Sequence, residues 1–503
     1  MMMTEMEMMK LQNGSDVRGV AVAGVPGEEV TLTPEAVDRI AAAFVSFLAK
    51  KLGKEPAALR IAVGHDSRIS ASLLQEAVFS GLTACAADVF KCDLASTPAM
   101  FMSIVFSQTQ MDGAIMLTAS HLPYNRNGMK FFTVEGGLEK TDIRALLAQA
   151  AALPEQHGDL AQVHALNLME LYAEHLCQTI SMRLGVPVEE KPLQGMHIVV
   201  DAGNGSGGFF VTDVLDVLGA DTTGSQFLEP DGMFPNHIPN PENAAAMAAI
   251  RAAVLENHAD LGLIFDTDVD RMSAVLSNGE EVNRNALIAM IAAILAPDYP
   301  GSTIVTDSVT SDELTEFLTQ TLHLVHHRYM RGYKNVIDEC IRLNEEGTLS
   351  PLAIETSGHG ALRENYYLDD GAFLAVRLII AAAQAKQQGK ELGDLIAALK
   401  QPAESVEYRL KITADQAGEY GKNVLQAFSE RAQAAGIQIA TPSYEGVRLV
   451  FPQGWALLRM SLHDPNMPLN IESKEAGGCK EITASLRQLL TGFEQLDISV
   501  LDV

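Results

Sequence analysis

The chain has 503 residues, of which 47% are hydrophobic and 20% charged, a composition typical of globular proteins. This length exceeds what one hydrophobic core supports, so we expect three or four domains. The formal net charge of −28 argues against a nucleic-acid-binding protein, because phosphate backbones are bound through clustered Lys and Arg side chains.

Cysteine usage and hydropathy indicate the cellular setting. Five scattered cysteines form no CxxC pair and no zinc-ligand spacing, which favours a reducing compartment. The Met-rich N-terminus is interrupted by acidic residues and lacks the apolar stretch of a secretion signal. The longest apolar run, residues 287–297, is too short to span a bilayer and predicts a buried helix. We predict a cytoplasmic monomer or homodimer that contacts neither nucleic acid nor a membrane.

Four regions follow one another along the chain. Residues 1–153 alternate strand-like runs (LRIAVGHD, DGAIMLTAS) with helical ones (PEAVDRIAAAFVSFLAKKL). Residues 154–298 begin with a helical stretch and then alternate apolar strands with Ala-rich helices, and residues 299–402 continue the alternation. Residues 403–503 place strand-like pieces around two amphipathic helices. The pattern predicts three α/β domains and a C-terminal α+β domain.

The first region carries one polar turn and two arginine-containing turns. The stretch TASHLPYNRNGMKFF places Ser120 beside His121 and leads to Lys130. By itself, this serine fits a nucleophile, a turn residue or a site of modification. The turns SDVRG and GHDSRIS make Arg18 and Arg68 candidates to face an anion, with surface ion pairs as the alternative.

Two motifs in the second region follow apolar strands. DAGNGSGG (201–208) satisfies G-x-G-x-x-G, with Asp221 near the distance expected of a ribose-binding acid. Any tight strand-to-helix turn enriches glycine, so a nicotinamide enzyme is disfavoured. In DTDVDRM, Asp266, Asp268 and Asp270 repel one another unless a cation compensates them, and oxygen ligands favour Mg²⁺ or Ca²⁺. A solvated acidic turn and a D-x-D phosphatase site with Asp266 as nucleophile are the alternatives.

The last two regions each carry a polar loop. In ETSGH, short polar side chains on a Gly-rich loop suit hydroxyl recognition, although the loop could equally cap a helix. Those side chains are Glu355, Ser357 and His359. In RMSLHDP, alternate residues of a strand face one way and could converge on a phosphate, or else form an exposed polar edge. Those residues are Arg459, Ser461 and His463. RGYK (331–334) adds a local basic cluster.

Taken in order, these motifs resemble those of the α-D-phosphohexomutase family, which includes phosphoglucomutase and phosphomannomutase. The resemblance runs from SDVRG through TASHLPYNRNGMK, DTDVDR, RGYK and ETSGH to RMSLHDP and covers nearly the whole chain. It implies three related α/β domains and a fourth domain of α+β type around a central cleft. It also implies interconversion of hexose 1-phosphate and hexose 6-phosphate, with glucose or mannose favoured, through a phosphoserine and a bisphosphorylated sugar.

The resemblance also implies roles for individual residues. Ser120 would carry the phosphoryl group and, with Asp266, Asp268 and Asp270, would hold one Mg²⁺ ion. Arg18, Lys130 and Arg271 match family positions at the reacting end. His121 is either a candidate base or a buried structural histidine, and the family match ranks Lys130 above it as the base. The set that binds the phosphosugar would comprise Lys334, Glu355, Ser357, His359, Arg459, Ser461 and His463. A sugar bisphosphate would serve as intermediate and activator.

Two loops depart from the family pattern. Leu462, His463 and Asp464 stand where Gly, Thr and Glu are usual, so the geometry of the phosphate clamp stays open. Ile354 and Thr356 flank Glu355 in the sugar loop, and the preferred hexose stays open with them. The alternative functions are a D-x-D sugar phosphohydrolase and a non-catalytic relative that binds sugar phosphates.

Overall fold

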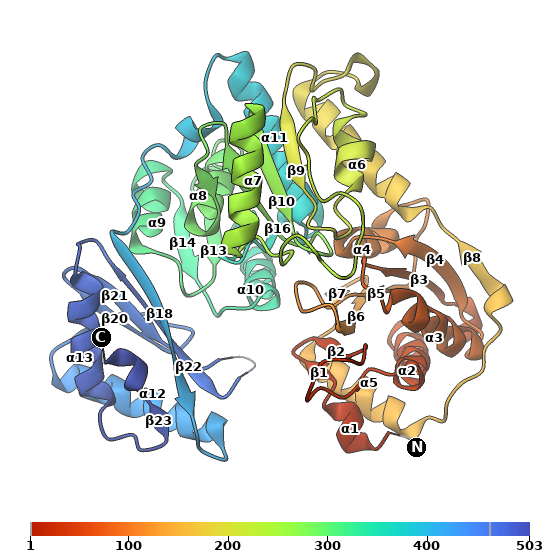
Figure 1. Cartoon of the computed structure of the whole chain (residues 1–503), viewed down its shortest axis with the longest axis horizontal. Helices are drawn as coiled ribbons and strands as arrows, with labels where there is room; N and C mark the ends of the chain where they lie inside the picture. Colours follow the sequence, from red (N-terminus) through yellow and green to blue (C-terminus); the bar gives the residue numbers. More distant parts are fainter. Residues whose placement is uncertain (1–2, 462–463, 503) are drawn as a thin grey trace. The chain divides into compact units, whose positions relative to one another are not determined.

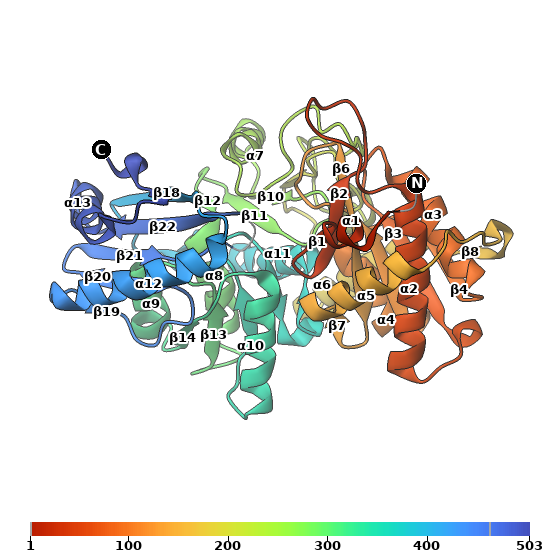
Figure 2. The same cartoon turned by 90° about the horizontal axis from the view of Figure 1, so that it is seen from below.

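A computed structural model of the chain describes residues 3–461 and 464–502 (Figures 1 and 2). The chain forms two compact units. The first comprises Met1–Asn283, Ser357–Gly360 and Leu368–Gly393, and the second comprises Arg284–Thr356, Ala361–Tyr367 and Asp394–Val503. Three α/β regions followed by an α+β region are confirmed as the fold class, whereas the domain limits at residues 153, 298 and 402 stay a prediction.

The first sheet of the first unit has the strand order β1-β2-β6-β5-β3-β4-β8, with β7 paired to β6. Strands β5, β3, β4 and β8 are parallel, and β6 is antiparallel to both of its neighbours, β5 and β2. The strands are β1 (Gln12–Asn13), β2 (Asp16–Val20), β3 (Arg60–His65), β4 (Asp88–Leu94), β5 (Gly113–Leu117), β6 (Arg126–Thr133), β7 (Gly136–Gly137) and β8 (Val163–Ala165).

Helices cover this sheet and close its core. They are α1 (Glu5–Met9), α2 (Pro34–Leu52), α3 (Ala71–Ala84), α4 (Thr97–Val105) and α5 (Lys140–Ala152). Helix α2 matches the helix predicted from the sequence: the Thr33 side chain caps its start, Pro34 occupies the first turn, and Gly53 ends it in the left-handed conformation at φ 62°. Its apolar face packs with α3 and α5 in one buried cluster.

The second sheet of the first unit has the order β12-β11-β10-β9, with β9 and β10 parallel and β11 and β12 antiparallel. Figure 2 shows α7 on one side of this sheet and α11 on the other. The elements are α6 (Leu168–Leu184), β9 (Ile198–Asp201), the π-helix Phe210–Leu215, α7 (Ala244–Asn257), β10 (Leu261–Phe265), β11 (Met272–Leu276), β12 (Glu281–Val282) and α11 (Gly371–Gln387). The acidic motif follows β10 directly, as the sequence predicts.

The second unit begins with α8, the buried helix predicted from the apolar run, and continues with a parallel sheet in which β13 lies between β14 and β15. The elements are α8 (Arg284–Leu295), β13 (Thr303–Thr306), α9 (Asp312–Glu316), the π-helix Phe317–Thr321, β14 (Val325–Arg328), α10 (Tyr333–Glu345), β15 (Leu352–Ile354) and β16 (Gly360–Leu362). The short strand β17 (Leu368–Asp369) follows in a segment that belongs to the first unit. Helix α10 begins within the RGYK motif, so this basic cluster lies at a helix start.

The C-terminal part of the second unit is an antiparallel sheet with the order β19-β20-β21-β22-β18-β23. Helices α12 and α13 pack on it around an apolar cluster (Figure 1). The elements are β18 (Glu404–Ile412), α12 (Ala417–Ala434), β19 (Gln438–Ile439), β20 (Val447–Phe451), β21 (Gly454–Leu458), β22 (Asn466–Ser473), α13 (Gly478–Leu490) and β23 (Leu496–Asp497). RMSLHDP is the connection between β21 and β22.

A buried polar cluster joins the two parts of the second unit. The Arg448 guanidinium stacks 3.6 Å from the centre of the Trp455 ring and pairs with Asp312 of α9 at 2.9 Å. The Trp455 indole N–H donates to Glu472 Oε2 at 3.1 Å. Burial, followed by the nearby charge of Glu313, raises the pKa of Glu472 to about 7 despite the opposing effect of Arg448.

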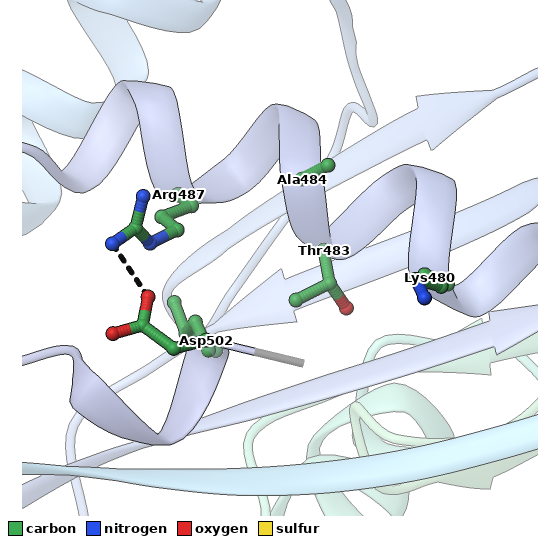
Figure 3. A pocket seen from close by; sticks show the side chains of 6 residues that line it. Lys480, Thr483, Ala484, Arg487 and Asp502 are labelled. Atoms are coloured by element: carbon green, nitrogen blue, oxygen red, sulfur yellow. Dashed lines mark ion pairs between the residues drawn. The ribbon is translucent and has the colours of Figure 1, made fainter.

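Two further findings concern the surface and the helices. A pocket between α13 and the C-terminal turn is lined by Lys480, Thr483, Ala484, Arg487, Leu501 and Asp502 (Figure 3). Arg487 and Asp502 are half exposed and form an ion pair at 2.5 Å, so the edge of this pocket is open to solvent. The pocket contains no residue of the predicted site.

Among the described residues, no helix combines the length and the apolar character needed to cross a bilayer.

Candidate active site

The predicted phosphoserine stands on a tightly held loop between β5 and β6. Ser120 has a left-handed backbone (φ 51°), which costs a non-glycine residue on the order of 1 kcal/mol, and its side chain is buried. The Arg68 guanidinium donates to four carbonyl oxygens of this loop, and they belong to Ser120, Leu122, Pro123 and Arg126 at 2.5 to 2.8 Å. This corrects the expectation that Arg68 faces an anion: Arg68 holds the loop in shape.

A second buried chain of contacts fixes the start of the same loop. Asp66 lies 3.3 Å from Arg68 Nε and accepts a hydrogen bond from the Thr118 hydroxyl at 2.7 Å. The Thr118 hydroxyl in turn accepts the Ser120 N–H at 2.9 Å. The serine side chain is therefore aimed by main-chain contacts on both sides of it.

The three aspartates of the second region come together as predicted. Asp266, Asp268 and Asp270 are buried, and one oxygen of each lies within 4.8 Å of the other two. Within residues 3–461 and 464–502, two of their buried oxygens, Asp268 Oδ1 and Asp270 Oδ1, accept no hydrogen bond. Buried carboxylate oxygens without donors are costly unless a cation is bound. The donor set therefore fits a hard divalent cation such as Mg²⁺.

Two basic side chains from different regions face this cluster. Lys130 Nζ donates to Asp268 Oδ2 at 3.1 Å and to Asp270 Oδ2 at 2.5 Å. Arg271 donates to Asp266 Oδ2 from Nε at 3.1 Å and from a terminal nitrogen at 2.9 Å. Burial followed by the charge of Asp270 raises the pKa of Asp266 well above its usual range.

Ser120 lies directly against this charged cluster. Its hydroxyl donates to Asp266 Oδ2 at 3.1 Å and accepts from Arg271 at 3.0 Å. These contacts join the serine loop of the first region to the acidic loop of the second, both within the first unit. The serine, the aspartates and Arg271, which the family resemblance groups at the reacting end, thus lie next to one another.

His121 adjoins the serine in its neutral form. Its Nδ1 accepts a hydrogen bond from Arg271 at 2.7 Å and lies 3.2 Å from Ser120 Oγ. Burial, then the charges of Arg271 and Arg18, lower the pKa of His121 to about 3. The imidazole therefore carries no charge at neutral pH, and its Nδ1 is an acceptor. Arg18 pairs with Asp16 at 2.9 Å on β2, which lies next to the β6 strand that follows the serine loop.

His359 lies at the acidic loop. Its Nδ1 is 2.5 Å from Asp369 and 3.9 Å from Asp270. Burial would lower the pKa of His359, but Asp369 and Asp270 together raise it to about 9, so the side chain is protonated at neutral pH. The sugar-binding role predicted for His359 stays a prediction; its position would place a proton donor beside the cluster.

The glycine-rich motif has a packing role. A Cβ on Gly205 would lie 2.6 Å from the Thr267 carbonyl oxygen, so only glycine lets the turn after β9 approach the acidic loop. The Ser206 N–H donates to that same oxygen at 2.8 Å. Gly203 and Gly208 are equally confined, against Pro239 and the Leu228 carbonyl oxygen, so close packing accounts for the glycines of the motif without a dinucleotide.

The remaining predicted residues belong to the second unit, apart from Ser357. Lys334 pairs with Asp338 one helical turn away at 3.2 Å, and Glu355 accepts the Gly332 N–H at 2.6 Å. Arg459 lies 3.6 Å from Glu445, which also accepts from the Ser308 hydroxyl at 2.5 Å. The Ser461 hydroxyl accepts the Asp464 N–H at 3.2 Å. His463 lies outside the described residues.

Sequence reasoning missed several residues that shape the site. Thr97, Asp369 and Asn240 contact Asp268, His359 and Arg271, respectively. Ser96-Thr97-Pro98 is a typical helix start, so the sequence indicates a cap and not a contact with a distant loop. Glu445 lies in a polar turn with no recognisable motif.

Comparison with known proteins identifies the family of the chain. Three domain families match: phosphoglucomutase/phosphomannomutase alpha/beta/alpha domains I, II and III, at residues 9–156, 170–279 and 283–402. A phosphomannomutase/phosphoglucomutase of Pseudomonas syringae pv. tomato is 28% identical over 87% of this chain and 89% of its own. A phosphoglucomutase of Neisseria gonorrhoeae is 26% identical over 92% and 93%, respectively. The crystal structure of a phosphoglucomutase/phosphomannomutase family protein from Burkholderia thailandensis superposes with a TM-score of 0.78 at 24% identity over 98% of each chain.

Proposed function

The chain belongs to the α-D-phosphohexomutase family and is a mutase, and we propose that it moves a phosphoryl group between the 1- and 6-positions of a hexose, with glucose or mannose phosphates as substrates. Relatives of this chain are named for both sugars. The observation that carries the proposal is Ser120 Oγ, buried within 3.1 Å of Asp266 and 3.0 Å of Arg271 beside a cluster of carboxylates. A hydrolase of Ser–His type would have no use for that cluster.

In the first transfer, phosphoserine 120 gives its phosphoryl group to the free hydroxyl of the bound sugar phosphate. The bond from phosphorus to Ser120 Oγ breaks, a bond from phosphorus to the sugar oxygen forms, and the hydroxyl proton of the sugar ends on the serine oxygen. The product is a sugar bisphosphate. The bisphosphate then reorients within the site. Its other phosphoryl group is transferred to Ser120, and the serine proton moves to the freed sugar oxygen.

Charge stabilisation falls to the basic groups around the serine. Arg271, one hydrogen bond from Ser120 Oγ, can follow the charge that develops on the serine oxygen. Lys130 lies on the other side of the cluster, between Asp268 and Asp270. Ser120, Asp266, Asp268 and Asp270 would hold one Mg²⁺, which when bound withdraws electron density from the phosphoryl oxygens.

Two acceptors lie within reach of the serine proton. Asp266 Oδ2 is 3.1 Å and His121 Nδ1 is 3.2 Å from Ser120 Oγ. His359, whose raised pKa of about 9 keeps it protonated, lies 3.9 Å from Asp270, and we assign it as a proton donor to a leaving oxygen. Lys130, ranked first from the family pattern, forms ion pairs with Asp268 and Asp270, and we assign it to charge stabilisation.

The phosphate that is not transferred needs its own clamp, which we assign to the second unit. Arg459 and Ser461 stand on the β21–β22 connection, and Lys334 and Glu355 stand at the start of α10 and after β15. The resemblance supports Glu355 and Ser357 of the sugar loop as the residues that contact sugar hydroxyls. The role of His463, and the cytoplasmic location, stay predictions.

Phosphorylation of Ser120 is the decisive test. We expect the purified protein to carry phosphate on the peptide that contains Ser120, and labelled hexose 1,6-bisphosphate to label that peptide in dephosphorylated protein. A panel of hexose 1-phosphates with Mg²⁺ and a trace of the matching bisphosphate identifies the sugar. Ser120→Ala should abolish mutase activity, while Ser103→Ala, which removes an equally buried hydroxyl from α4, should not. A fully active Ser120→Ala protein would sink the proposal.

The same assays separate the alternatives. An Asp266 nucleophile would release inorganic phosphate in a reaction that Asp266→Asn abolishes and Ser120→Ala spares. The geometry disfavours this phosphohydrolase, because Asp266 Oδ2 already accepts hydrogen bonds from Ser120 and Arg271. Tight binding of phosphosugars without isomerisation, even with added bisphosphate, would instead indicate a binding protein.

A further inference from the structure

Thr97 contacts the acidic loop through both its main chain and its side chain. The Thr97 hydroxyl donates to Asp268 Oδ2 at 2.6 Å, and the Thr97 N–H donates to the Asp268 carbonyl oxygen at 2.8 Å. Thr97 is buried and 171 residues away from Asp268 in sequence. The two bonds fix both the main chain and the carboxylate of one aspartate in the middle of the acidic loop.

The two oxygens of Asp268 are used unequally. Oδ2 accepts from Thr97 and from Lys130 Nζ, whereas Oδ1 is buried and accepts no hydrogen bond within the described parts of the chain. A carboxylate held through one oxygen presents the other in a fixed direction. Partners of this kind orient metal ligands and tune the affinity of the site.

Helix α4 adds a favourable field at the same point. Thr97 is its first residue, the Ser96 side chain caps it by accepting the Ala99 N–H, and the helix start carries partial positive charge. The negative Asp268 carboxylate lies at this end. The cap belongs to Ser96, so the Thr97 hydroxyl is available for Asp268 and is not needed to start the helix.

We propose that Thr97 is a positioning residue for the divalent cation: its hydroxyl occupies Asp268 Oδ2, so that Oδ1 is presented to the metal. The inference rests on the metal site of the proposed function. Thr97 touches neither the substrate nor the metal and acts through Asp268. Its removal should therefore weaken metal binding while leaving the chemistry intact at saturating metal.

The test is Thr97→Val, which keeps the shape of the side chain and removes only the hydroxyl. Titration calorimetry of the purified protein with Mg²⁺ alone, repeated with Mn²⁺ by electron paramagnetic resonance, should show affinity about 10- to 100-fold below wild type. Thr97→Ser keeps the hydroxyl and should bind close to wild type. Thr83→Val is the matched control, because Thr83 is also buried and, among the described residues, its hydroxyl donates only to main-chain carbonyls of its own helix α3.

Activity gives a second readout that a merely structural defect would not match. Raising the Mg²⁺ concentration should restore the kcat of Thr97→Val to near wild type, whereas a misfolded protein would not be rescued. Equal metal affinity in wild type and Thr97→Val would overturn the role of Thr97 and leave the metal site standing. A wild-type protein that binds neither cation would overturn the metal site of the proposed function and this inference with it.

Discussion

Glu472 is expected to make the second unit less stable as the pH rises from acid to neutral. Its carboxyl is buried beside Trp455 and near Glu313, and its pKa rises from the ordinary 4.5 to about 7. Between these two values the folded protein binds a proton that the unfolded chain releases. The free energy of unfolding therefore falls as the pH rises through this window and is constant above it.

The size of the effect follows from the pKa difference. A shift from 4.5 to about 7 at about 1.4 kcal/mol per unit gives about 3 kcal/mol of unfolding free energy lost above pH 7. Glu472→Gln removes the charge and keeps an acceptor for the Trp455 indole. We expect this variant to be more stable than wild type by about 3 kcal/mol at pH 8, with the advantage vanishing near pH 4.5.

The chain offers a local reporter for this measurement. Trp455 is the single tryptophan of the sequence and donates directly to Glu472, so its fluorescence during urea unfolding follows the second unit. Wild type and Glu472→Gln are compared at half-unit steps from pH 5 to pH 8, and other titrating groups cancel in the difference. Glu430→Gln on α12 controls for the loss of a surface carboxylate. A difference that does not change with pH would refute the reasoning.

Three further predictions concern the first unit. Arg68→Lys keeps the charge, but one ammonium group cannot donate to all the carbonyls of the serine loop. The kcat should therefore fall about 100-fold or more, while the KM for the phosphosugar changes far less. An unchanged kcat in a steady-state assay would count against the role of Arg68 in holding the loop. Gly205→Ala brings a Cβ to 2.6 Å from the Thr267 carbonyl oxygen. The variant should lose about 1–3 kcal/mol of unfolding free energy in a denaturant titration and should bind Mg²⁺ more weakly. Unchanged stability and affinity would show that the turn can relax around the extra methyl group. His121 is neutral above its pKa of about 3, so His121→Gln should leave the shape of the pH–rate profile from pH 5 to pH 9 unchanged; loss of an ionisation in that range would contradict the buried environment found for His121.

Local pattern predicted the elements well where it was strong. Helix α2 and the buried helix α8 appear where the helical pattern and the apolar run predicted them. The acidic motif after β10 was identified as a metal site because three carboxylates at such spacing need compensation. Each of these inferences depends on neighbours in sequence, and such neighbours stay neighbours in the fold.

Contacts between distant segments could not be predicted in the same way. Nothing in GHDSRIS indicates that Arg68 donates to carbonyls more than 50 residues later, because carbonyl groups are common to all residues. The link between Thr97 and Asp268 is equally hidden, since an S-T-P helix start occurs wherever a helix needs a cap. The family resemblance brought Ser120 and the aspartates together, but it did not identify the residues that hold them in place.

The hydrogen bonds from Arg68 make the conformation of the serine loop independent of whether Ser120 is phosphorylated. All of its contacts with the loop go to main-chain oxygens, which are the same whether position 120 carries a hydroxyl or a phosphoester. The main-chain conformation of the loop is therefore held in the same way with and without a phosphoryl group on Ser120. For the proposed function, this means that the serine loop keeps its position through both transfers and that the bisphosphorylated sugar is the component that reorients.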